Sequence, residues 1–154
     1  MGHGPNLGTA YLKAMKGGNK KLPTKGTVFL SISNKLKLEF GNIAQELIDL
    51  GFNFIATKGT AAHLRKKGIK SKVIWRISDK KHPDILSVMR RGNVDLIINL
   101  PTGRRAATDG AQMRRLAVEL GIPFITTLTG AKAAIDSLKD GEKDYLKPLK
   151  KIKY

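Results

Sequence analysis

With 154 residues, the chain has the length of one ordinary domain. Its composition, 41% hydrophobic and 27% charged, is that of a globular protein, and no apolar run approaches the roughly 20 residues of a membrane-spanning helix. The absence of cysteine excludes disulfides, thiol nucleophiles and zinc ribbons. The net charge of +17 predicts an anionic partner and leaves its kind open: nucleic acid, a phosphorylated metabolite or an acidic protein surface.

Residues 1–26 differ in composition from the rest of the chain. They are rich in glycine and lysine and end in the turn-forming sequence Leu-Pro-Thr-Lys-Gly, which predicts a linker. Within them, only residues 12–15 have the pattern of a helical turn. The segment has neither the apolar core of a signal peptide nor the Arg- and Ser-rich pattern of a transit peptide, so we expect a cytoplasmic protein with no membrane contact.

From residue 27 onward, short apolar runs alternate with segments of helical periodicity. The predicted strands cover residues 28–32, 52–56, 72–75, 94–100 and 123–126. The predicted helices have apolar positions between 40 and 48 and then cover 60–67, 83–91, 106–120 and 130–138, and a glycine closes each of them except the last. This alternation predicts an α/β three-layer sandwich, in which helices cover both faces of a five-stranded parallel sheet.

Ligands of such sheets bind beyond the carboxyl ends of the strands, so the loops after the strands are the candidate binding segments. The loop after the first strand runs from Ser31 to Lys37 and offers hydroxyls and amines. Ser33 and Asn34 in this loop also suit a structural role, because either is a good N-cap for the following helix.

The loop after the second strand contains Thr57, Lys58, Gly59 and Thr60. Gly59 allows the backbone to approach a ligand, and the free N–H groups of the following helix start face an anion. Thr60 suits a plain N-cap equally well, and the short pattern alone does not separate the two roles.

Two further polar residues follow strands. Asn99 emerges from an apolar strand and either braces a neighbouring loop or contacts a ligand, and Arg76 follows the third strand, where it could also be an ordinary surface charge. Both fall where Lys37, Thr57 and Thr60 are expected to meet, in one crevice. Cations, hydroxyls and an amide together predict a site for a small anionic metabolite with a second polar group rather than for duplex DNA.

Several segments occur in an order and spacing that resemble one family. They are residues 51–61 (GFNFIATKGTA), 68–69 (GI), 95–99 (DLIIN), 113–117 (MRRLA) and 122–127 (IPFITT). Together they resemble the methylglyoxal-synthase-like domain that ends the large subunit of carbamoyl-phosphate synthase. Residues 7–14 (LGTAYLKA) resemble the last turn of the second ATP-grasp half of that enzyme. The implied division is a linker with an ATP-grasp remnant (1–26), the domain (27–138) and a basic tail (139–154).

The resemblance implies a regulatory, non-catalytic domain of a ligase that makes carbamoyl phosphate for pyrimidine and arginine biosynthesis. The implied partners are the catalytic halves of the large subunit and the glutaminase small subunit, and the parent enzyme uses ATP with Mg or Mn. Carried over, Lys37, Thr57 and Thr60 would hold the phosphate of an effector, and Ser31, Arg76 and Asn99 would contribute. A basic residue at position 76 resembles nucleotide-regulated relatives and favours UMP or IMP. Relatives that respond to N-acetylglutamate share the sequence NLP at 99–101 but carry an aromatic at position 76, which makes this effector the alternative.

The nearest rival is methylglyoxal synthase itself, in which the same cradle holds dihydroxyacetone phosphate and a carboxylate removes a proton. That family carries its catalytic Asp in a Gly-Asp turn, ten residues before the glycine that ends the third helix. Here His82 stands at that position and the nearest acid, Asp84, is two residues away. We therefore expect Asp79 and Asp84 to cap or flank the following helix, and Asp109 to serve at the start of the helix that contains Met113.

A nucleic-acid-binding module is the second rival because of the net charge. Aromatic residues make up only 6% of the chain, and Trp75 beside Arg76 is the one suggestive pair, so we expect no nucleic-acid partner. His63 and His82 stand alone, without a ligand at metal-site spacing, so we expect no metal and no cofactor in this chain.

Overall fold

The computed structural model describes residues 22–144, and the side chains of all of these except 105, 106 and 141–144. One parallel sheet has the strand order β3-β2-β1-β4-β5, with strands Gly26–Ile32 (β1), Phe52–Thr57 (β2), Lys72–Ile74 (β3), Leu96–Leu100 (β4) and Phe124–Ile125 (β5). The α-helices are Lys37–Asp49 (α2), Lys58–Lys66 (α3), Ile85–Arg90 (α4), Arg104–Leu120 (α5) and Leu128–Asp144 (α6), and the 3-10 helices are Asn34–Leu36 (η1) and Ile77–Asp79 (η2).

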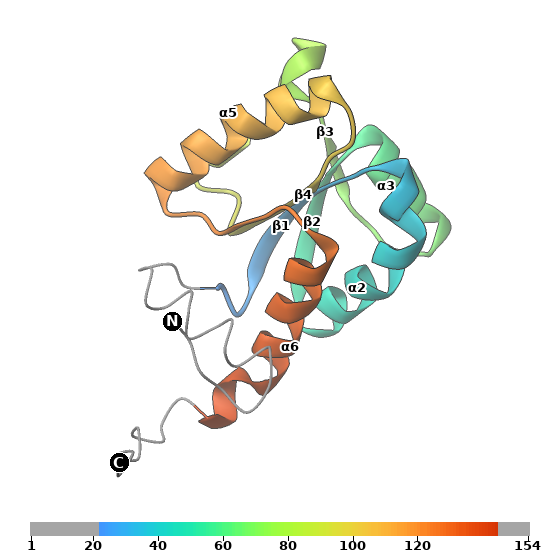
Figure 1. Cartoon of the computed structure of the whole chain (residues 1–154), viewed down its shortest axis with the longest axis vertical. Coiled ribbons are helices and arrows are strands. Elements are labelled where there is room, and N and C mark those ends of the chain that lie inside the picture. Colours follow the sequence, from blue (N-terminus) through green and yellow to red (C-terminus); the bar gives the residue numbers. More distant parts are fainter. Residues whose placement is uncertain (1–21, 145–154) are drawn as a thin grey trace.

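Helices cover both faces of the sheet, which confirms the predicted three-layer sandwich (Figure 1). Val28 and Leu30 of β1 pack with residues of α2, α3 and α6, whereas Phe29 between them packs with residues of α4 and α5. Successive side chains of a strand point to opposite faces, so a central strand with a helix layer on each side must be apolar throughout.

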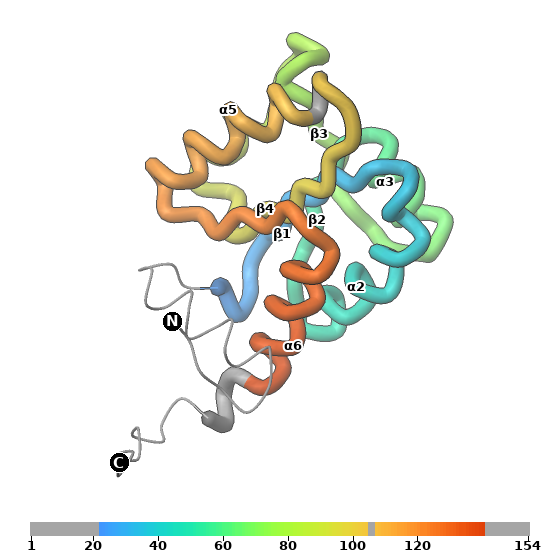
Figure 2. The backbone as a smooth tube through the Cα atoms, in the orientation of Figure 1, coloured from blue at the N-terminus to red at the C-terminus, as the bar shows by residue number. Residues whose placement is uncertain are grey.

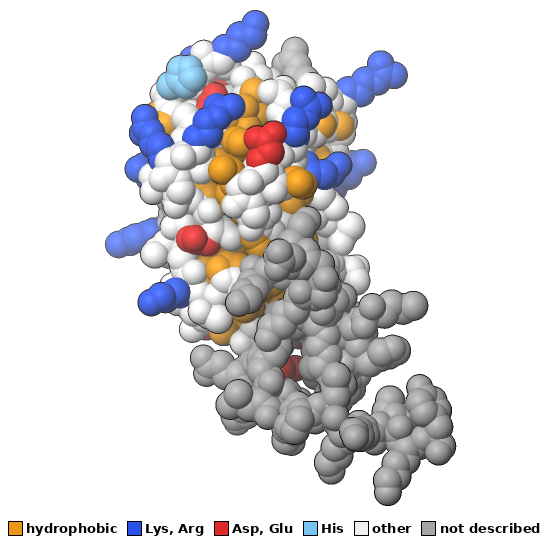
Figure 3. Space-filling model, turned by 90° about the vertical axis from the view of Figure 1, so that its left-hand side faces the viewer, with side chains coloured by type: hydrophobic (Ala, Val, Ile, Leu, Met, Phe, Trp, Pro, Cys, Tyr) orange, Lys and Arg blue, Asp and Glu red, His pale blue; other side chains and the backbone are white. Residues whose placement is uncertain are grey.

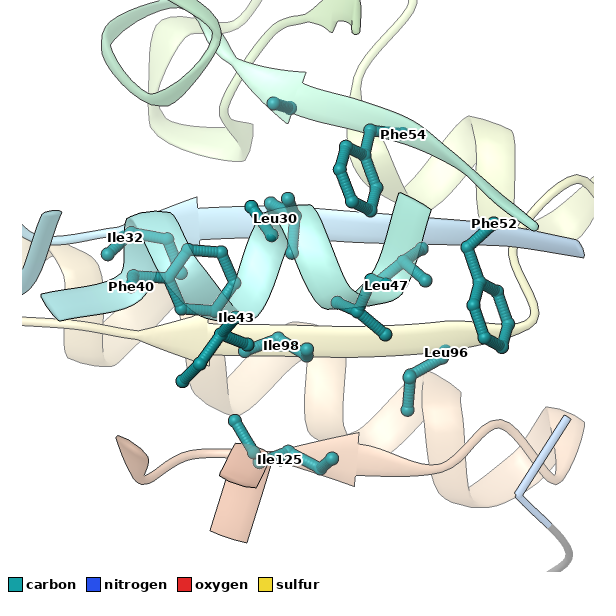
Figure 4. Packing of buried hydrophobic residues seen from close by; sticks show 14 of the residues in the cluster. Leu30, Ile32, Phe40, Ile43, Leu47, Phe52, Phe54, Leu96, Ile98 and Ile125 are labelled. Atoms are coloured by element: carbon teal, nitrogen blue, oxygen red, sulfur yellow. The ribbon is translucent and has the colours of Figure 1, made fainter. Parts of the chain in front are cut away.

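The larger core lies between the sheet and α2. Phe40, Ile43 and Leu47 follow one another along one face of this helix and lie over Leu30 and Ile98 of the two central strands (Figure 4). All five side chains are at most 2% exposed. Complete burial of a side chain of this size stabilises a fold by roughly 1.5–3 kcal/mol, so this layer contributes much of the stability.

The folded part of the chain extends beyond the expected bounds of the domain at both ends. Leu22, placed in the predicted linker, is 8% exposed and belongs to the core cluster. The last helix continues beyond the predicted end at residue 138 to Asp144, and the Nζ of Lys139 lies 2.7 Å from a carboxylate oxygen of Glu46 on α2. The remainder of the predicted linker (1–21), with its helical turn at 12–15, and the end of the predicted tail (145–154) lie outside the described residues.

The elements otherwise follow the predicted order, with small shifts at their ends. The helix predicted over 83–91 begins at Ile85, because the Asp84 side chain accepts a hydrogen bond of 2.9 Å from the Ser87 N–H and caps the helix. This confirms the expected capping role of Asp84. Helix α5 ends at the predicted glycine, Gly121, which adopts φ 70°.

Strand β1 lies between β2 and β4, so the chain leaves it toward one edge of the sheet and returns on its other side. The smooth trace in Figure 2 follows this path, and β2 and β4 lie on opposite sides of β1. Loops diverge at such a switch point and leave a crevice at the carboxyl ends of the strands.

Candidate anion-binding site

A crevice of about 370 Å³ opens at the carboxyl ends of the central strands. Its walls come from the ends of β1, β2 and β4, from the loop after β3 and from α5. Six of the seven predicted site residues line it: Ser31, Lys37, Thr57, Gly59, Arg76 and Asn99. The structure therefore brings together side chains that come from segments far apart in the sequence.

Lys37 is the first residue of α2 and carries the main positive charge of the crevice. Its Nζ donates a hydrogen bond of 2.6 Å to the side-chain oxygen of Asn34. Burial, and then the charges of Arg76 and Lys66, hold the pKa of Lys37 below its ordinary value of 10.5. No salt bridge joins Lys37 to a carboxylate among the described residues, so its charge is available to an anion.

The positive potential extends behind the crevice to α3. Burial, followed by the charge of Lys67, lowers the pKa of His63, whereas a hydrogen bond with the Lys37 backbone raises it and the charges of Lys37 and Lys66 lower it. His63 therefore lies within a group of cations, whose mutual repulsion a bound anion would reduce.

Thr57 and Gly59 form the part of the wall at the start of α3. Thr57 is the N-cap residue, yet its side chain makes no capping hydrogen bond to the helix backbone. Gly59 leaves open the space beside Lys37, since a Cβ at this position would lie 3.4 Å from the Nζ of Lys37. A helix start beside a lysine and a threonine hydroxyl has the donors that bind a phosphate or carboxylate.

Thr60 is the predicted site residue that lies outside the crevice lining. It is 2% exposed, and its Oγ1 accepts hydrogen bonds from the Ile32 N–H at 3.0 Å and from the Thr57 hydroxyl at 3.2 Å. The suggested N-cap role for Thr60 is wrong, because Thr60 lies inside α3 and Thr57 occupies the N-cap position. Its contacts tie α3 to the end of β1 and orient Thr57.

The loop after β1 departs from the predicted capping pattern. Ser33 precedes η1 but makes no side-chain cap, and Asn34 accepts from Lys37 instead. The Ser33 Oγ lines the crevice region, is buried and has no hydrogen-bond partner among the described residues. A buried hydroxyl without a partner is unfavourable, so a ligand group that bonded to Ser33 would stabilise the site.

Arg76, in the loop after β3, and Asp109, on α5, both line the crevice. Arg76 precedes η2, where the Asp79 side chain accepts a 3.2 Å hydrogen bond from the backbone N–H of Arg76. Asp109, inside α5, is 8% exposed and accepts from the Ser78 hydroxyl at 2.8 Å and from the Ser78 N–H at 3.3 Å. The predicted place of Asp109 at a helix start is therefore wrong, because it fastens the loop after β3 to α5.

Asn99 is 3% exposed at the end of β4 and faces Gly110 of α5, where a Cβ would lie 2.9 Å from the Asn99 Nδ2. No hydrogen bond joins the Asn99 amide to another described group, so the scaffold alternative has no contact to support it.

Ser33, Asn34, Ser78 and Asp109 also line the crevice. Ser33 and Asn34 lie in the predicted binding loop, where a capping role was the alternative, whereas Ser78 and Asp109 were not predicted as site residues. A signal existed for Asp109, since it shares a four-residue spacing with Met113 and Ala117, which are 3% and 0% exposed. An acid on the buried face of a helix needs a polar partner or a ligand.

A parallel sheet with a cationic crevice at its switch point defines a class of small α/β domains that bind anionic ligands. The family model described as MGS-like domain matches residues 39–126, and the chain belongs to this family.

Three similar proteins are named as a carbamoyl phosphate synthase large chain or as its C-terminal section. The chain is 44% identical over 140 residues to the carbamoyl phosphate synthase large chain, C-terminal section, of Methanocaldococcus jannaschii, and 41% identical over 140 residues to the protein of the same name from Methanopyrus kandleri. It is also 44% identical over 140 residues to the carbamoyl phosphate synthase large chain of Archaeoglobus fulgidus. These alignments cover 89–90% of this chain but only 23%, 26% and 13% of the three relatives.

None of the helices in residues 22–144 is long and apolar enough to cross a membrane. The same residues contain no group of three or more His, Asp or Glu side chains that could hold a metal ion.

Proposed function

We propose that this chain is the regulatory domain of a cytoplasmic carbamoyl phosphate synthase and binds a small phosphate-bearing effector, UMP or IMP, in the crevice. The observation that carries the proposal is the unpaired Lys37 ammonium beside the start of α3, where Arg76 adds a second positive charge. The volume of about 370 Å³ lies within the range of small-molecule sites.

The lining residues suit the different parts of a nucleotide. Lys37, Thr57 and Gly59 would hold the phosphate, while Thr60 would orient Thr57. Asn99 and Asp109, which also line the crevice, offer an amide and a carboxylate to the hydroxyl and N–H groups of a sugar or base. A ligand with a phosphate alone would leave these polar groups unused.

The arrangement of the acids counts against a lyase of the methylglyoxal synthase type. Asp79 and Asp84 both accept hydrogen bonds from backbone N–H groups, and Asp109 is held by Ser78. These contacts engage Asp79 and Asp84, the two acids nearest to the expected place of a catalytic base, and one carboxylate oxygen of Asp109. We therefore assign to this domain regulation rather than catalysis.

The resemblance to carbamoyl-phosphate synthase implies the remaining parts of the proposed enzyme. In that enzyme, ATP with Mg or Mn would bind the catalytic halves of the large chain and not this domain. The glutaminase small subunit would be a further partner.

Titration of the chain with UMP, IMP, N-acetylglutamate and dihydroxyacetone phosphate tests the proposal. Trp75 is the only tryptophan and adjoins Arg76, so its fluorescence reports binding beside calorimetry. We expect saturable nucleotide binding that Lys37→Ala and Thr57→Ala weaken and that Lys70→Ala, at an exposed position on the loop after α3, leaves unchanged. Turnover of dihydroxyacetone phosphate, or tighter binding of N-acetylglutamate than of either nucleotide, would contradict it.

A further inference from the structure

Residues 75–84, between β3 and α4, form a loop that projects from the body of the domain (Figure 1). Its two ends are joined, because Trp75 pairs with Asp84 and the Trp75 N–H donates a 3.1 Å hydrogen bond to the Pro83 carbonyl. Within the loop, the Lys80 N–H donates to the Ile77 carbonyl at 3.1 Å. The loop therefore has a shape set by its own hydrogen bonds.

The outer part of this loop carries two exposed lysines, Lys80 and Lys81. Lys80 adopts the left-handed φ of 52°, which few residues other than glycine tolerate. The two carboxylates of the loop, Asp79 and Asp84, cap backbone N–H groups, and Asp84 also lies 3.8 Å from the Nδ1 of the neighbouring His82. Neither carboxylate forms a salt bridge with Lys80 or Lys81 in the described part of the chain, so the two lysines present positive charge without a carboxylate partner.

Arg76, Ile77 and Ser78 at the base of the same loop line the crevice. Asp109 fastens this base to α5 through Ser78. Across the crevice, the charges of Arg76 and Lys37 repel each other, and an anion bound between them would remove that repulsion. Binding would therefore favour an arrangement in which Arg76 and the loop base lie closer to Lys37.

The space-filling view shows other Lys and Arg side chains spread over the same end of the molecule (Figure 3). Protein is favoured over nucleic acid as the partner of the loop, because its single aromatic, Trp75, is half-buried and lies beneath Lys81, whose Nζ is 4.5 Å from the ring centre. Lys81 thus covers a face of Trp75 on which a base would stack, which counts against nucleic acid as the partner.

We propose that residues 75–84 form a docking loop: Lys80 and Lys81 bind an acidic protein surface elsewhere in the synthase, and the loop base transmits occupancy of the crevice to that surface. The inference rests on the proposed function for its partner and its signal. Two ligand states with different contacts at the loop base are what such a coupling requires.

Hydrogen exchange in the assembled synthase tests the docking without any effector. Amides of residues 76–82 should exchange about tenfold more slowly in the synthase than in the 154-residue chain. Lys80→Glu with Lys81→Glu should abolish this protection. Arg90→Glu with Arg91→Glu, a matched pair at the end of α4, should keep it. Melting of each variant chain confirms that it is folded. Equal exchange in synthase and isolated chain would overturn the proposal, as would protection that appears only when a single-stranded DNA oligonucleotide is added.

Measurements with the effector distinguish a failure of the docking loop from a failure of the proposed function. The loop variant should bind UMP or IMP as wild type does, measured by calorimetry, and should lose the effect of that nucleotide on carbamoyl phosphate formation. A wild-type response in the variant would overturn the transmission role of the loop. Absence of nucleotide binding by the wild-type chain would overturn the proposed function instead, while the exchange result would still decide whether the loop docks.

Discussion

Helix α2 contributes to two regions, the hydrophobic core and the crevice, which differ in whether their side chains stabilise the fold. Its apolar face, with Phe40, Ile43 and Leu47, is buried against the sheet, whereas its first residue, Lys37, lies in the crevice beside other cations. Burial stabilises the first region, while repulsion and desolvation destabilise the second. The difference indicates that the core holds the helix in place and that the crevice uses this support to keep an unfavourable charge ready for a ligand.

A substitution in the core face of α2 should have the largest effect on the free energy of unfolding. Leu47→Ala removes a side chain that is 0% exposed, and we expect a loss of about 2–5 kcal/mol in the free energy of unfolding. Urea denaturation measures this loss, and nucleotide affinity of the folded variant should stay near that of wild type. An equal loss of affinity would show that the two regions are not separable.

Lys37→Met should have the opposite pattern. The change keeps most of the apolar stem and removes the charge, so nucleotide binding should weaken by about 1.5–3 kcal/mol, the usual worth of a hydrogen bond to a charged group. The variant should unfold at higher urea concentration than wild type at neutral pH, because the repulsion by Arg76 and Lys66 is gone. A variant that lost both stability and binding would assign Lys37 a structural role.

Thr60 connects the two regions, because its hydroxyl accepts hydrogen bonds from Ile32 of β1 and from Thr57 of the crevice. Thr60→Val leaves the Ile32 N–H, which now donates to the Thr60 hydroxyl at 3.0 Å, without its acceptor. We expect a loss of about 1–3 kcal/mol in the free energy of unfolding, together with weaker nucleotide binding through the freed Thr57. Thr60→Ser keeps the oxygen and is the matched control, which should retain binding. Full affinity in the valine variant would separate Thr60 from the site.

The smallest expected effect is a pH dependence of stability. The pKa of Lys37 is lower in the folded chain than the 10.5 expected when it is unfolded, so between these two values the unfolded chain binds more protons. The destabilisation by Lys37 is therefore complete below this window and disappears as the pH rises through it. The stability advantage of Lys37→Met over wild type should shrink between pH 7 and about pH 10.5. An advantage that stays constant would place the cause outside the charge.

Much of the fold could be predicted because it depends on local patterns. The buried runs around Leu30 and Ile98 indicate central strands, and the periodicity of α2 indicates which of its faces is covered. The site could be predicted in part for the same reason, since polar residues after the strands of a parallel sheet share one edge. The MGS-like family assignment agrees with both.

The order of the elements, the two-sided burial of the central strands and the edge of the sheet where cations gather can be derived from the amino-acid sequence, because they follow from periodicity and strand direction. The contact of Thr60 with the Ile32 backbone, in place of a position in the crevice lining, and the hydrogen bond from Ser78 to Asp109, 31 residues away, depend on the tertiary structure. Such contacts depend on how α3 and α5 pack on the sheet. That packing is set by the sum of many distant side chains, and no short segment of the sequence records it.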